Sequence, residues 1–225
     1  MSKCLVIPDV HGQLAKLRII EDTLFSKVDR IVSLGDWFDS FRPYPIRELC
    51  EWLKDHPDIE KLLGNHDCHY FFRGQGWKCS GYSGVTQLIV DEELPHDLLR
   101  EQFKVSTYVG HYLCTHAGYH PVTFDKHLVE QEALDMAWEG RYSKLWEPGQ
   151  ARGGRAAFGG PTWLDFSYEF SESDDLPRQI VGHTHGKTVR TKVTKGGKVS
   201  YCLDTGLRHV AVVDEDTSEV EIVEL

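Results

Sequence analysis

A chain of 225 residues is long enough for one substantial hydrophobic core, so we expect a single domain spanning residues 1–225. Its composition, 40% hydrophobic and 27% charged, is typical of a globular protein, and no apolar stretch approaches the roughly 18 residues needed to span a membrane. The net charge of −10 argues against a protein that follows a nucleic-acid backbone, so no stable nucleic-acid partner is expected, but phosphorylated substrates are not excluded.

The first third of the chain alternates strand and helix patterns. Residues 3–7, 30–34 and 59–63 are short apolar runs of the kind found in buried strands. Residues 14–25 and 46–53 between them carry apolar side chains at helical spacing. This order predicts a βαβαβ arrangement with parallel strands and right-handed crossovers.

After residue 100 the pattern changes to short strands. Residues 104–109 and 112–115 predict one hairpin, and Gly196-Gly197 predicts the turn of another. Further strands are expected at residues 179–181, 188–194, 198–203, 210–213 and 220–223.

The residues between the strand at 112–115 and the strand at 179–181 lack the strand pattern and predict a cap beside the sheets. Residues 124–138 are expected to form a helix, and the Gly- and Arg-rich residues 149–160 a loop. Together they predict a helical and loop cap at about residues 120–165.

The cysteines and the first residues indicate a cytoplasmic protein. None of the six cysteines forms a C-x-x-C pair, which argues against a structural zinc site and a compact disulfide framework. The apolar run in residues 1–8 is too short for a signal peptide. We therefore expect reduced thiols and no membrane association.

Polar side chains able to bind metal ions follow the predicted strands. Asp9 and His11 come after the first strand, Asp36 after the second and Asn65 after the third. Because the carboxyl ends of parallel strands meet at one edge of a sheet, we expect these side chains to converge. Histidines that follow strands of the second half are expected to join them: His116, His183 and His185.

This donor set favours two metal ions over one. Oxygen and nitrogen ligands without a thiolate suit Mn²⁺, Fe or Zn²⁺, and we expect Mn²⁺ first. Seven ligands exceed what one tetrahedral ion can use, whereas a carboxylate such as Asp36 can bridge two ions about 3.5–4 Å apart. Gly35, Gly64 and Gly182 precede ligands, and we expect them to let the backbone turn sharply there.

The five polar blocks, taken in order, resemble the calcineurin-like metallophosphoesterase superfamily. The blocks are Asp9-x-His11, Gly35-Asp36-x-x-Asp39, Gly64-Asn65-His66-Asp67, His116 and Gly182-His183-Thr184-His185. Asp39, the His116-Ala117-Gly118 block and Asp204-Thr205-Gly206 resemble more particularly the serine/threonine phosphoprotein phosphatase branch, with its bacterial, phage and diadenosine-tetraphosphatase-like members. The resemblance implies an α/β fold, a four-layer α/β/β/α sandwich with two central mixed β-sheets.

The resemblance also implies roles for the residues of these blocks. His66 would protonate the leaving oxygen, and Asp39 would orient its imidazole. The nucleophile would be a hydroxide bridging the metals, which attacks phosphorus without a covalent intermediate. The implied ligands are Asp9, His11, Asp36 and His185 for one metal and Asp36, Asn65, His116 and His183 for the other.

One departure concerns the grip on phosphate. In the phosphatase branch the second Asp is usually followed by a phosphate-binding Arg, but here Asp39 is followed by Ser40. Arg42 is one substitute, and Arg152 resembles the second phosphate-gripping Arg of the branch, with Arg155 as a near alternative. A planar guanidinium can hold two phosphate oxygens, so at least one Arg is expected in the site.

Single members of the set have ordinary structural interpretations. A histidine on a strand is more often packed in a core, and a Gly-Asp pair is more often a turn, so only the complete set favours a metal site. Histidines without a motif are interpreted as packing or surface residues: His56, His69, His96, His111, His120, His127 and His209. Among these, His69 is the nearest rival ligand.

Three functions remain open at this point. The first is a dinuclear metal-dependent phosphatase for phosphoproteins or small phosphate monoesters. The second is a nucleotide pyrophosphohydrolase or phosphodiesterase, such as a diadenosine tetraphosphatase. The third is a catalytically idle metal-binding scaffold, against which the retention of both His66 and Asp39 speaks.

Overall fold

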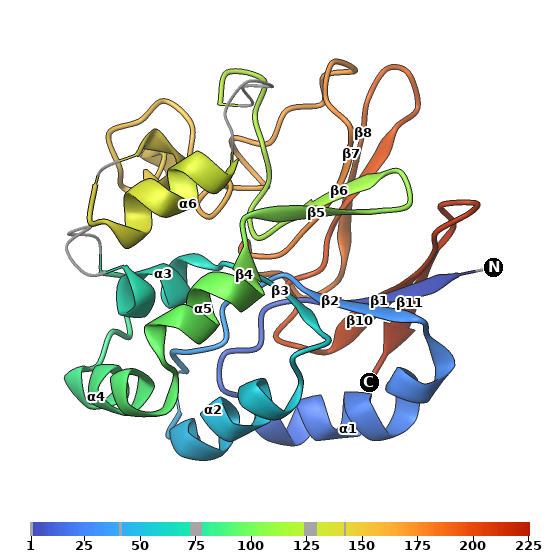
Figure 1. Ribbon diagram of the computed structural model, residues 1–225. Helices are drawn as coiled ribbons and strands as arrows, with labels where there is room; N and C mark the ends of the chain where they lie inside the picture. The colour runs from blue at the N-terminus through green and yellow to red at the C-terminus, as the bar shows by residue number, and fades with distance from the viewer. Residues whose placement is uncertain (1, 41, 73–77, 124–129, 142) are drawn as a thin grey trace.

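Two stacked β-sheets form the centre of the computed structural model, which describes residues 2–40, 42–72, 78–123, 130–141 and 143–225 (Figure 1). The first sheet contains β1 (Lys3–Ile7), β2 (Arg30–Ser33), β3 (Glu60–Leu62), β4 (Phe103–Lys104), β10 (His209–Asp214) and β11 (Val220–Glu224). The second contains β5 (Ser106–Val109), β6 (Tyr112–Thr115), β7 (Arg178–Val181), β8 (Arg190–Val193) and β9 (Val199–Cys202). Their strand orders are β11-β10-β1-β2-β3-β4 and β5-β6-β7-β9-β8.

The predicted βαβαβ unit is confirmed in the first sheet. β1, β2 and β3 are parallel neighbours, connected through α1 (Leu14–Leu24), the short 3-10 helix η1 (Phe25–Lys27) and α2 (Ile46–Asp55). The helices lie together below this sheet (Figure 1). The apolar side chains of α1 recur every three residues, so Leu14, Leu17 and Ile20 are buried on one face.

The predicted pair of mixed sheets is also confirmed. β10 is antiparallel to β1, and β7 is parallel to both β6 and β9 while β5 and β8 are antiparallel edge strands. The core between the sheets includes Cys4, Val6, Leu62, Cys114 and Ile180. On the outer side of the second sheet, Leu164, Phe166 and Phe170 pack near Val181 and Cys202. This outer layer is made of turns, whereas the other outer layer is helical.

The predicted strand 104–109 is in fact two strands in different sheets. β4 pairs in parallel with β3, and β5 pairs antiparallel with β6. The chain crosses between the sheets at Val105, which is 1% exposed. Because both halves are extended and partly buried, the residue pattern does not reveal the break.

The sequence pattern predicts no element between residues 65 and 102. The described part of this range, residues 65–72 and 78–102, contains three helices: α3 (Asn65–Phe71), α4 (Gly84–Glu93) and α5 (His96–Gln102). Of the helix predicted at 124–138, the structure has α6 (Glu130–Trp138), and residues 124–129 lie outside the described residues. Trp138 packs against Phe71 and Phe72 at the end of α3. α6 therefore packs against the helical side of the molecule, next to the end of α3.

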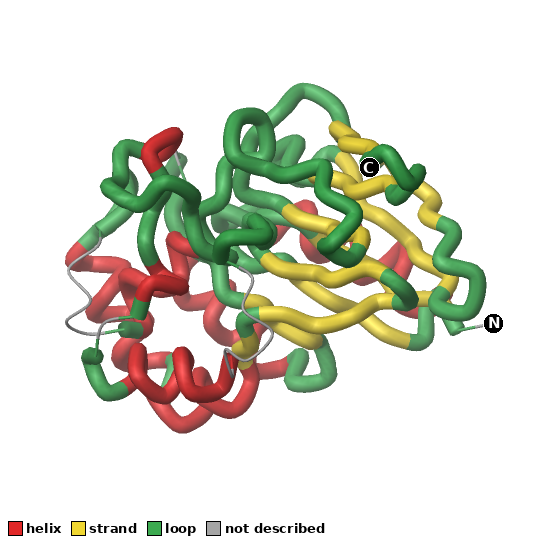
Figure 2. Tube along the Cα trace, turned by 90° about the horizontal axis from the view of Figure 1, so that it is seen from above, coloured by secondary structure: helices red, strands yellow, loops and turns green. Residues whose placement is uncertain are grey.

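The strands of the two sheets point toward the helical side of the molecule. Figure 2 shows the strands running side by side, with most of the helical segments gathered beyond one end of them. The short 3-10 helices η2 (Lys144–Trp146) and η3 (Gln150–Arg152) lie in the same part of the chain as α6. No helix in the described ranges is long and apolar enough to cross a membrane.

Candidate metal centre

The polar side chains predicted to bind metal do converge at the carboxyl ends of strands from both sheets. Asp9 follows β1, Asp36 follows β2, and Asn65 begins α3 just after β3. His116 and His183 follow β6 and β7 of the second sheet. Two clusters of these residues bring their ligand atoms within 4.8 Å of one another: Asp36 with His116 and His183, and Asp36 with Asp9 and His11.

Three of these loops hold non-glycine residues in the left-handed region, four residues in all. The φ angles are 45° at His11, 52° at Asp36, 61° at Asp39 and 63° at His183. Such conformations cost free energy and persist only where surrounding contacts impose them, most often at functional sites. The backbone is thus strained at the positions that aim side chains into the cluster.

The glycines before the ligands serve two different purposes. Gly35 has a φ of +99°, so the predicted sharp turn is confirmed there. Gly64 and Gly182 have no positive φ, which makes the turn explanation wrong for them. Instead, a Cβ on Gly64 would lie 2.1 Å from Asp36 Oδ1, and one on Gly182 would lie 1.9 Å from Asp9 Oδ1. These two glycines leave room for the ligand carboxylates.

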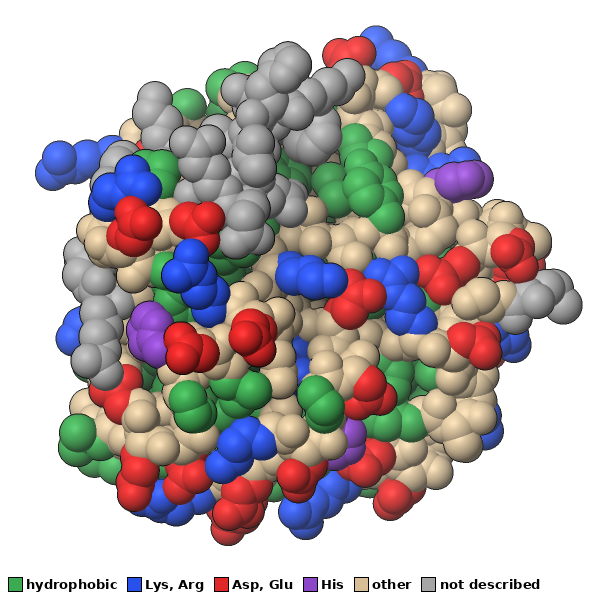
Figure 3. All heavy atoms as spheres, viewed as in Figure 1, with side chains coloured by type: hydrophobic (Ala, Val, Ile, Leu, Met, Phe, Trp, Pro, Cys, Tyr) green, Lys and Arg blue, Asp and Glu red, His purple; other side chains and the backbone are tan. Residues whose placement is uncertain are grey.

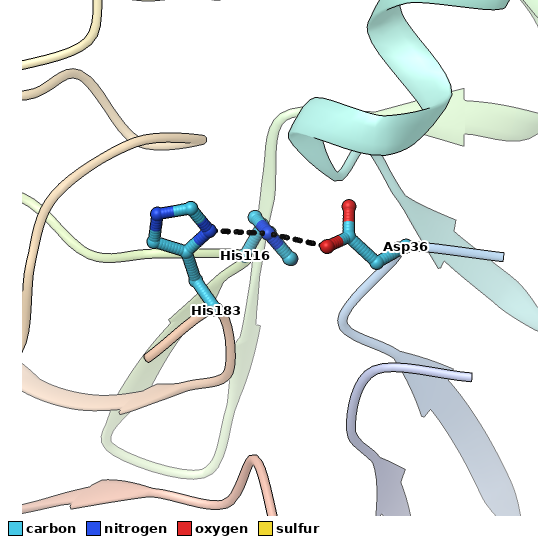
Figure 4. Close-up of side chains that lie close together, drawn as sticks. All are labelled: Asp36, His116 and His183. Atoms are coloured by element: carbon cyan, nitrogen blue, oxygen red, sulfur yellow. Dashed lines mark hydrogen bonds and ion pairs between the residues drawn. The ribbon is translucent and has the colours of Figure 1, made fainter. Parts of the chain in front are cut away.

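His116 stands at the middle of the first cluster (Figure 4). Its Nε2 is 3.1 Å from His183 Nδ1, 3.4 Å from Asp36 Oδ2 and 3.0 Å from Asn65 Oδ1. Its Nδ1 lies 2.9 Å from the carbonyl oxygen of Leu34 and must therefore carry the ring proton of a neutral imidazole. Nε2 then presents a lone pair to the cluster.

Asn65, Asp36 and His183 supply the other polar atoms of this cluster. Asn65 donates from Nδ2 to Cys79 Sγ at 3.1 Å, which turns its carbonyl oxygen toward His116. Asp36 contributes a carboxylate oxygen and His183 a ring nitrogen. His116 Nε2, Asn65 Oδ1 and Asp36 Oδ2 thus meet beside a ring nitrogen of His183, and this mixture of nitrogen and oxygen suits a divalent transition metal.

The pKa shifts of the protein without metal follow from the same crowding. Although burial alone would lower it, Asp36 and Asp9 raise the pKa of His116 to about 9, so that a proton takes the place of the cation. Burial favours the neutral acid of Asp36, but His116 and His66 hold its pKa well below the usual range. Burial raises the pKa of Asp9 to about 8, with a further contribution from Asp204.

The second cluster joins Asp9 and His11 to Asp36. His11 Nδ1 donates to the carbonyl oxygen of Asp39 at 2.7 Å, which leaves Nε2, 3.6 Å from Asp36 Oδ2, free to bind a metal. His185 is not part of either cluster: its side chain is 67% exposed and its Nδ1 is 3.3 Å from Asp204 Oδ1. A carboxylate that holds one ring nitrogen is the usual partner of a metal-binding histidine.

A third group with metal-like spacing consists of Asp39, His66 and His69. His69 Nδ1 accepts the backbone N–H of Cys79 at 3.0 Å, so its proton sits on Nε2, the atom that faces Asp39. A protonated nitrogen cannot bind a metal. The group is therefore a hydrogen-bonding cluster, and His69 is buried beside the site rather than a rival ligand.

Asp67 has a role that the sequence reasoning missed. Its carboxylate accepts the backbone N–H groups of Asp36, Trp37 and Gly64 at 2.8, 2.8 and 2.9 Å, and so clamps the turn that presents Asp36. The available signal was its position as the third residue of α3, where an acidic side chain commonly caps backbone N–H groups.

The three candidate arginines are placed differently. Arg152 lies on η3 with Nε 2.9 Å from Asp165 Oδ2, and its NH2 donates to Thr184 Oγ1 at 3.0 Å, between His183 and His185. Arg42 and Arg155 are exposed. Arg152 is thus the one fixed against the loop that carries a candidate ligand.

One known protein family matches the sequence of this chain. The model of the family described as calcineurin-like phosphoesterase matches residues 2–187. No curated protein matches the chain.

Solved structures share the fold at low sequence identity. A cold-active protein-tyrosine phosphatase of the psychrophile Shewanella sp. has a TM-score of 0.62 at 16% identity, covering 100% of this chain and 81% of that one. A protein serine/threonine phosphatase from Saccharomyces cerevisiae has a TM-score of 0.54 at 17% identity, covering 100% and 80%. A putative diadenosine tetraphosphatase has a TM-score of 0.53 at 15% identity, covering 99% and 93%.

Proposed function

The chain belongs to the calcineurin-like phosphoesterase family, and on this premise we propose that it hydrolyses phosphate monoesters with the help of two divalent cations, Mn²⁺ foremost. The observation that carries the proposal is the convergence of three polar atoms, Asp36 Oδ2, Asn65 Oδ1 and His183 Nδ1, on the Nε2 atom of His116. The Leu34 carbonyl holds the ring proton of the neutral His116 on its other nitrogen. The substrates would be phosphoproteins or small phosphorylated molecules.

Two overlapping ligand sets would hold the cations. Asp36 would be shared, with Asp9, His11 and His185 on one side and Asn65, His116 and His183 on the other. When bound, two cations lower the pKa of an attacking water and neutralise charge on the phosphoryl oxygens. The fixed Nδ1–H donors of His11 and His116 keep the Nε2 lone pairs of both imidazoles directed at the site.

His66 would supply the proton to the leaving oxygen. Its Nδ1 lies 2.8 Å from Asp39 Oδ2, which leaves Nε2 to deliver a proton. Its backbone N–H donates to Asp36 Oδ1 at 2.9 Å, so the acid is tied to the residue shared by the metals. The edge-to-face contact of its ring with His11, at 5.1 Å between centroids, places it beside the proposed metal site.

Arg152 is the arginine we propose for phosphate binding. Asp165 and Thr184 fix its guanidinium against the loop between His183 and His185, which supports a defined contact with phosphate oxygens. The segment that carries Arg152, within the proposed cap at about residues 120–165, would then form one wall of the substrate site.

Charge and cysteine chemistry support the proposed partners and compartment. On the face in Figure 3, basic and acidic side chains of the described residues are interspersed without a continuous basic area, which supports a small or protein substrate over a nucleic acid. All six cysteines are free thiols, as expected in the cytoplasm, where we propose that the protein acts.

Steady-state hydrolysis by metal-stripped protein, with and without added Mn²⁺, tests the proposal. The substrates are p-nitrophenyl phosphate, bis-p-nitrophenyl phosphate and diadenosine tetraphosphate, with Asp36→Asn as the control for contaminating activity. Mn²⁺-dependent turnover of the monoester is expected. Preferred turnover of either of the others would replace the monoesterase assignment with a diesterase or pyrophosphohydrolase, and no turnover despite two bound metals would favour the scaffold.

A further inference from the structure

Asp39 is surrounded by more donors than the orientation of His66 requires. Its Oδ2 lies 2.8 Å from His66 Nδ1 and also 2.8 Å from His69 Nε2. Its Oδ1 accepts the hydroxyl of Tyr70. The Asp39 side chain is 3% exposed and that of His69 is 1% exposed, so these contacts are shielded from water.

The direction of His69 is fixed from both sides of its ring. His66 and His69 are three residues apart on α3, which places both side chains on one face of the helix. The backbone N–H of Cys79 donates to Nδ1 at 3.0 Å, so the proton is on Nε2. In the described part of the chain Nε2 has no hydrogen bond of good geometry, and the Asp39 carboxylate is what offsets its burial.

The chain after residue 78 closes this arrangement from behind. The ring of Tyr82 lies edge-to-face with His69 at 5.2 Å and is stacked on Tyr70 at 5.3 Å. Gly81, with a φ of +102°, lets the backbone pass so close that a Cβ there would lie 3.2 Å from Asp39 Cβ. The carboxylate therefore has little freedom to rotate.

We propose that His69 is a positioning residue for the acid step: its Nε2–H anchors Asp39 Oδ2 at the point where that oxygen holds His66 Nδ1. This inference rests on the proposed function, because it assigns a task within the proton transfer by His66. His69 itself touches neither metal nor substrate.

The anchoring has an electrostatic purpose as well as a steric one. Burial would favour the neutral acid of Asp39, but the donors His66, His69 and Tyr70 all lie against this carboxylate and favour its ionised form. An ionised Asp39 accepts the Nδ1–H of His66 and stabilises its imidazolium, whose Nε2–H is the proton given to the leaving oxygen. The ring is then left as the neutral Nδ1–H tautomer. Loss of His69 would leave that carboxylate buried with one fewer donor and freer to turn.

The test compares two replacements at His69 on two esters that differ in leaving group. Gln places an amide nitrogen near the position of Nε2 and can still donate, whereas Leu fills the volume without a donor. His69→Leu is expected to lower kcat for phenyl phosphate by about 10- to 100-fold, the usual effect of losing an outer-shell partner. For p-nitrophenyl phosphate, whose leaving group needs little protonation, kcat should change less than about threefold. His69→Gln should recover most of the lost rate.

Three results would overturn the inference. The first is an equal loss of kcat on both esters in His69→Leu. The second is a loss of kcat that adds fully to that of His66→Asn in the double variant. The third is a His69→Gln protein with unchanged metal content whose kcat is as low as that of His69→Leu. A purely structural role predicts these results, because a damaged fold slows both esters alike.

A spectroscopic measurement separates this inference from the proposed function. Imidazole ¹⁵N spectra of Zn²⁺-loaded protein are recorded at alkaline pH, where imidazoles are neutral, with the His66 signals assigned through His66→Asn. They should show one Nδ1–H tautomer in the wild type and in His69→Gln but a mixture in His69→Leu. An unchanged tautomer in His69→Leu contradicts the inference even if the enzyme is active. A wild type inactive on both esters contradicts the proposed function, while the tautomer still decides the inference.

Discussion

Two neighbouring clusters in this protein each combine an aspartate with two histidines, yet they have opposite chemistry. Around His116, the Asp36 carboxylate and a ring nitrogen of His183 face the His116 Nε2 atom, whose ring bears its proton on the other nitrogen. Around Asp39, the N–H groups of His66 and His69 and the hydroxyl of Tyr70 all face a single carboxylate. The first cluster favours a bound cation, or a proton on His116 in its absence, whereas the carboxylate of the second is surrounded by donors from its own side chains.

The difference lies in what holds the far nitrogen of each ring. The carbonyl oxygen of Leu34 accepts from His116 Nδ1, so the ring proton of the neutral His116 points away from the first cluster. The backbone N–H of Cys79 donates to His69 Nδ1, so the ring proton of His69 is on Nε2, the nitrogen nearest Asp39 in the second cluster. Residue types and distances alone do not distinguish a metal site from a hydrogen-bonded one. The backbone partner of each imidazole does.

The largest expected effect comes from Asp36→Asn, which removes the charge shared by both proposed metal sites. Activity should fall to background, and bound metal measured by elemental analysis should fall with it. Metal at 100 times its dissociation constant stabilises the wild type by about 2.7 kcal/mol. That corresponds to a rise in Tm of roughly 5–10 °C for a domain of this size, and the variant should lose it. Unchanged metal stoichiometry would argue against a shared Asp36.

His66→Asn tests the other cluster without touching the first. We expect kcat for an alkyl phosphate to fall by about 10²–10⁴-fold, the range typical of a lost general acid. Metal content and the Tm increase on adding Mn²⁺ should stay at wild-type values. Full activity on the alkyl phosphate would show that His66 is not the acid.

Asp67→Asn tests the backbone hydrogen bonds that hold Asp36 in the first cluster. An amide cannot accept all three N–H groups that the carboxylate now accepts, and a buried unpaired donor costs about 1–3 kcal/mol. We expect metal affinity to drop about 10- to 100-fold. Asp22→Asn, at an exposed position of α1, is the matched control, and equal metal affinities for the two variants would exclude this role.

The smallest effect is expected from Arg152→Lys, at the edge of both clusters. Lysine keeps the charge but loses the planar pair of donors, so kcat/KM should fall about tenfold, the value of one hydrogen bond to a charged group. Arg42→Lys and Arg155→Lys, at exposed positions, should remain near wild type. If either of these loses more activity than Arg152→Lys, the phosphate contact has been assigned to the wrong residue.

The parallel strands and the convergence of ligands could be predicted because each depends on a local pattern. A short apolar run followed by a glycine and a polar residue marks the end of β2 and of β3, and topology then brings those ends together. The transfer of the chain from β4 to β5 could not be predicted, because residues 103–109 form one extended run with no glycine or proline at Val105. Nothing in the local pattern separates the two sheets there.

The role of His69 was missed for a different reason. As a single histidine outside the motif it is predicted to be a packing residue, and it is indeed buried. Its spacing of three from His66 was visible in the sequence, but its proton position depends on Cys79, ten residues further along. A contact that fixes a tautomer has no signature in residue order.

The rates at which the buried cysteines are alkylated can report on how often each part of the fold opens. Burial raises the pKa of Cys4 and of Cys50 to about 12, so neither should react with alkylating reagents at neutral pH while the protein is folded. Cys4 lies between the two sheets and Cys50 lies on α2, in the core under the helices. Alkylation rates at the two thiols would therefore report separately on parting of the sheets and on release of the helical layer.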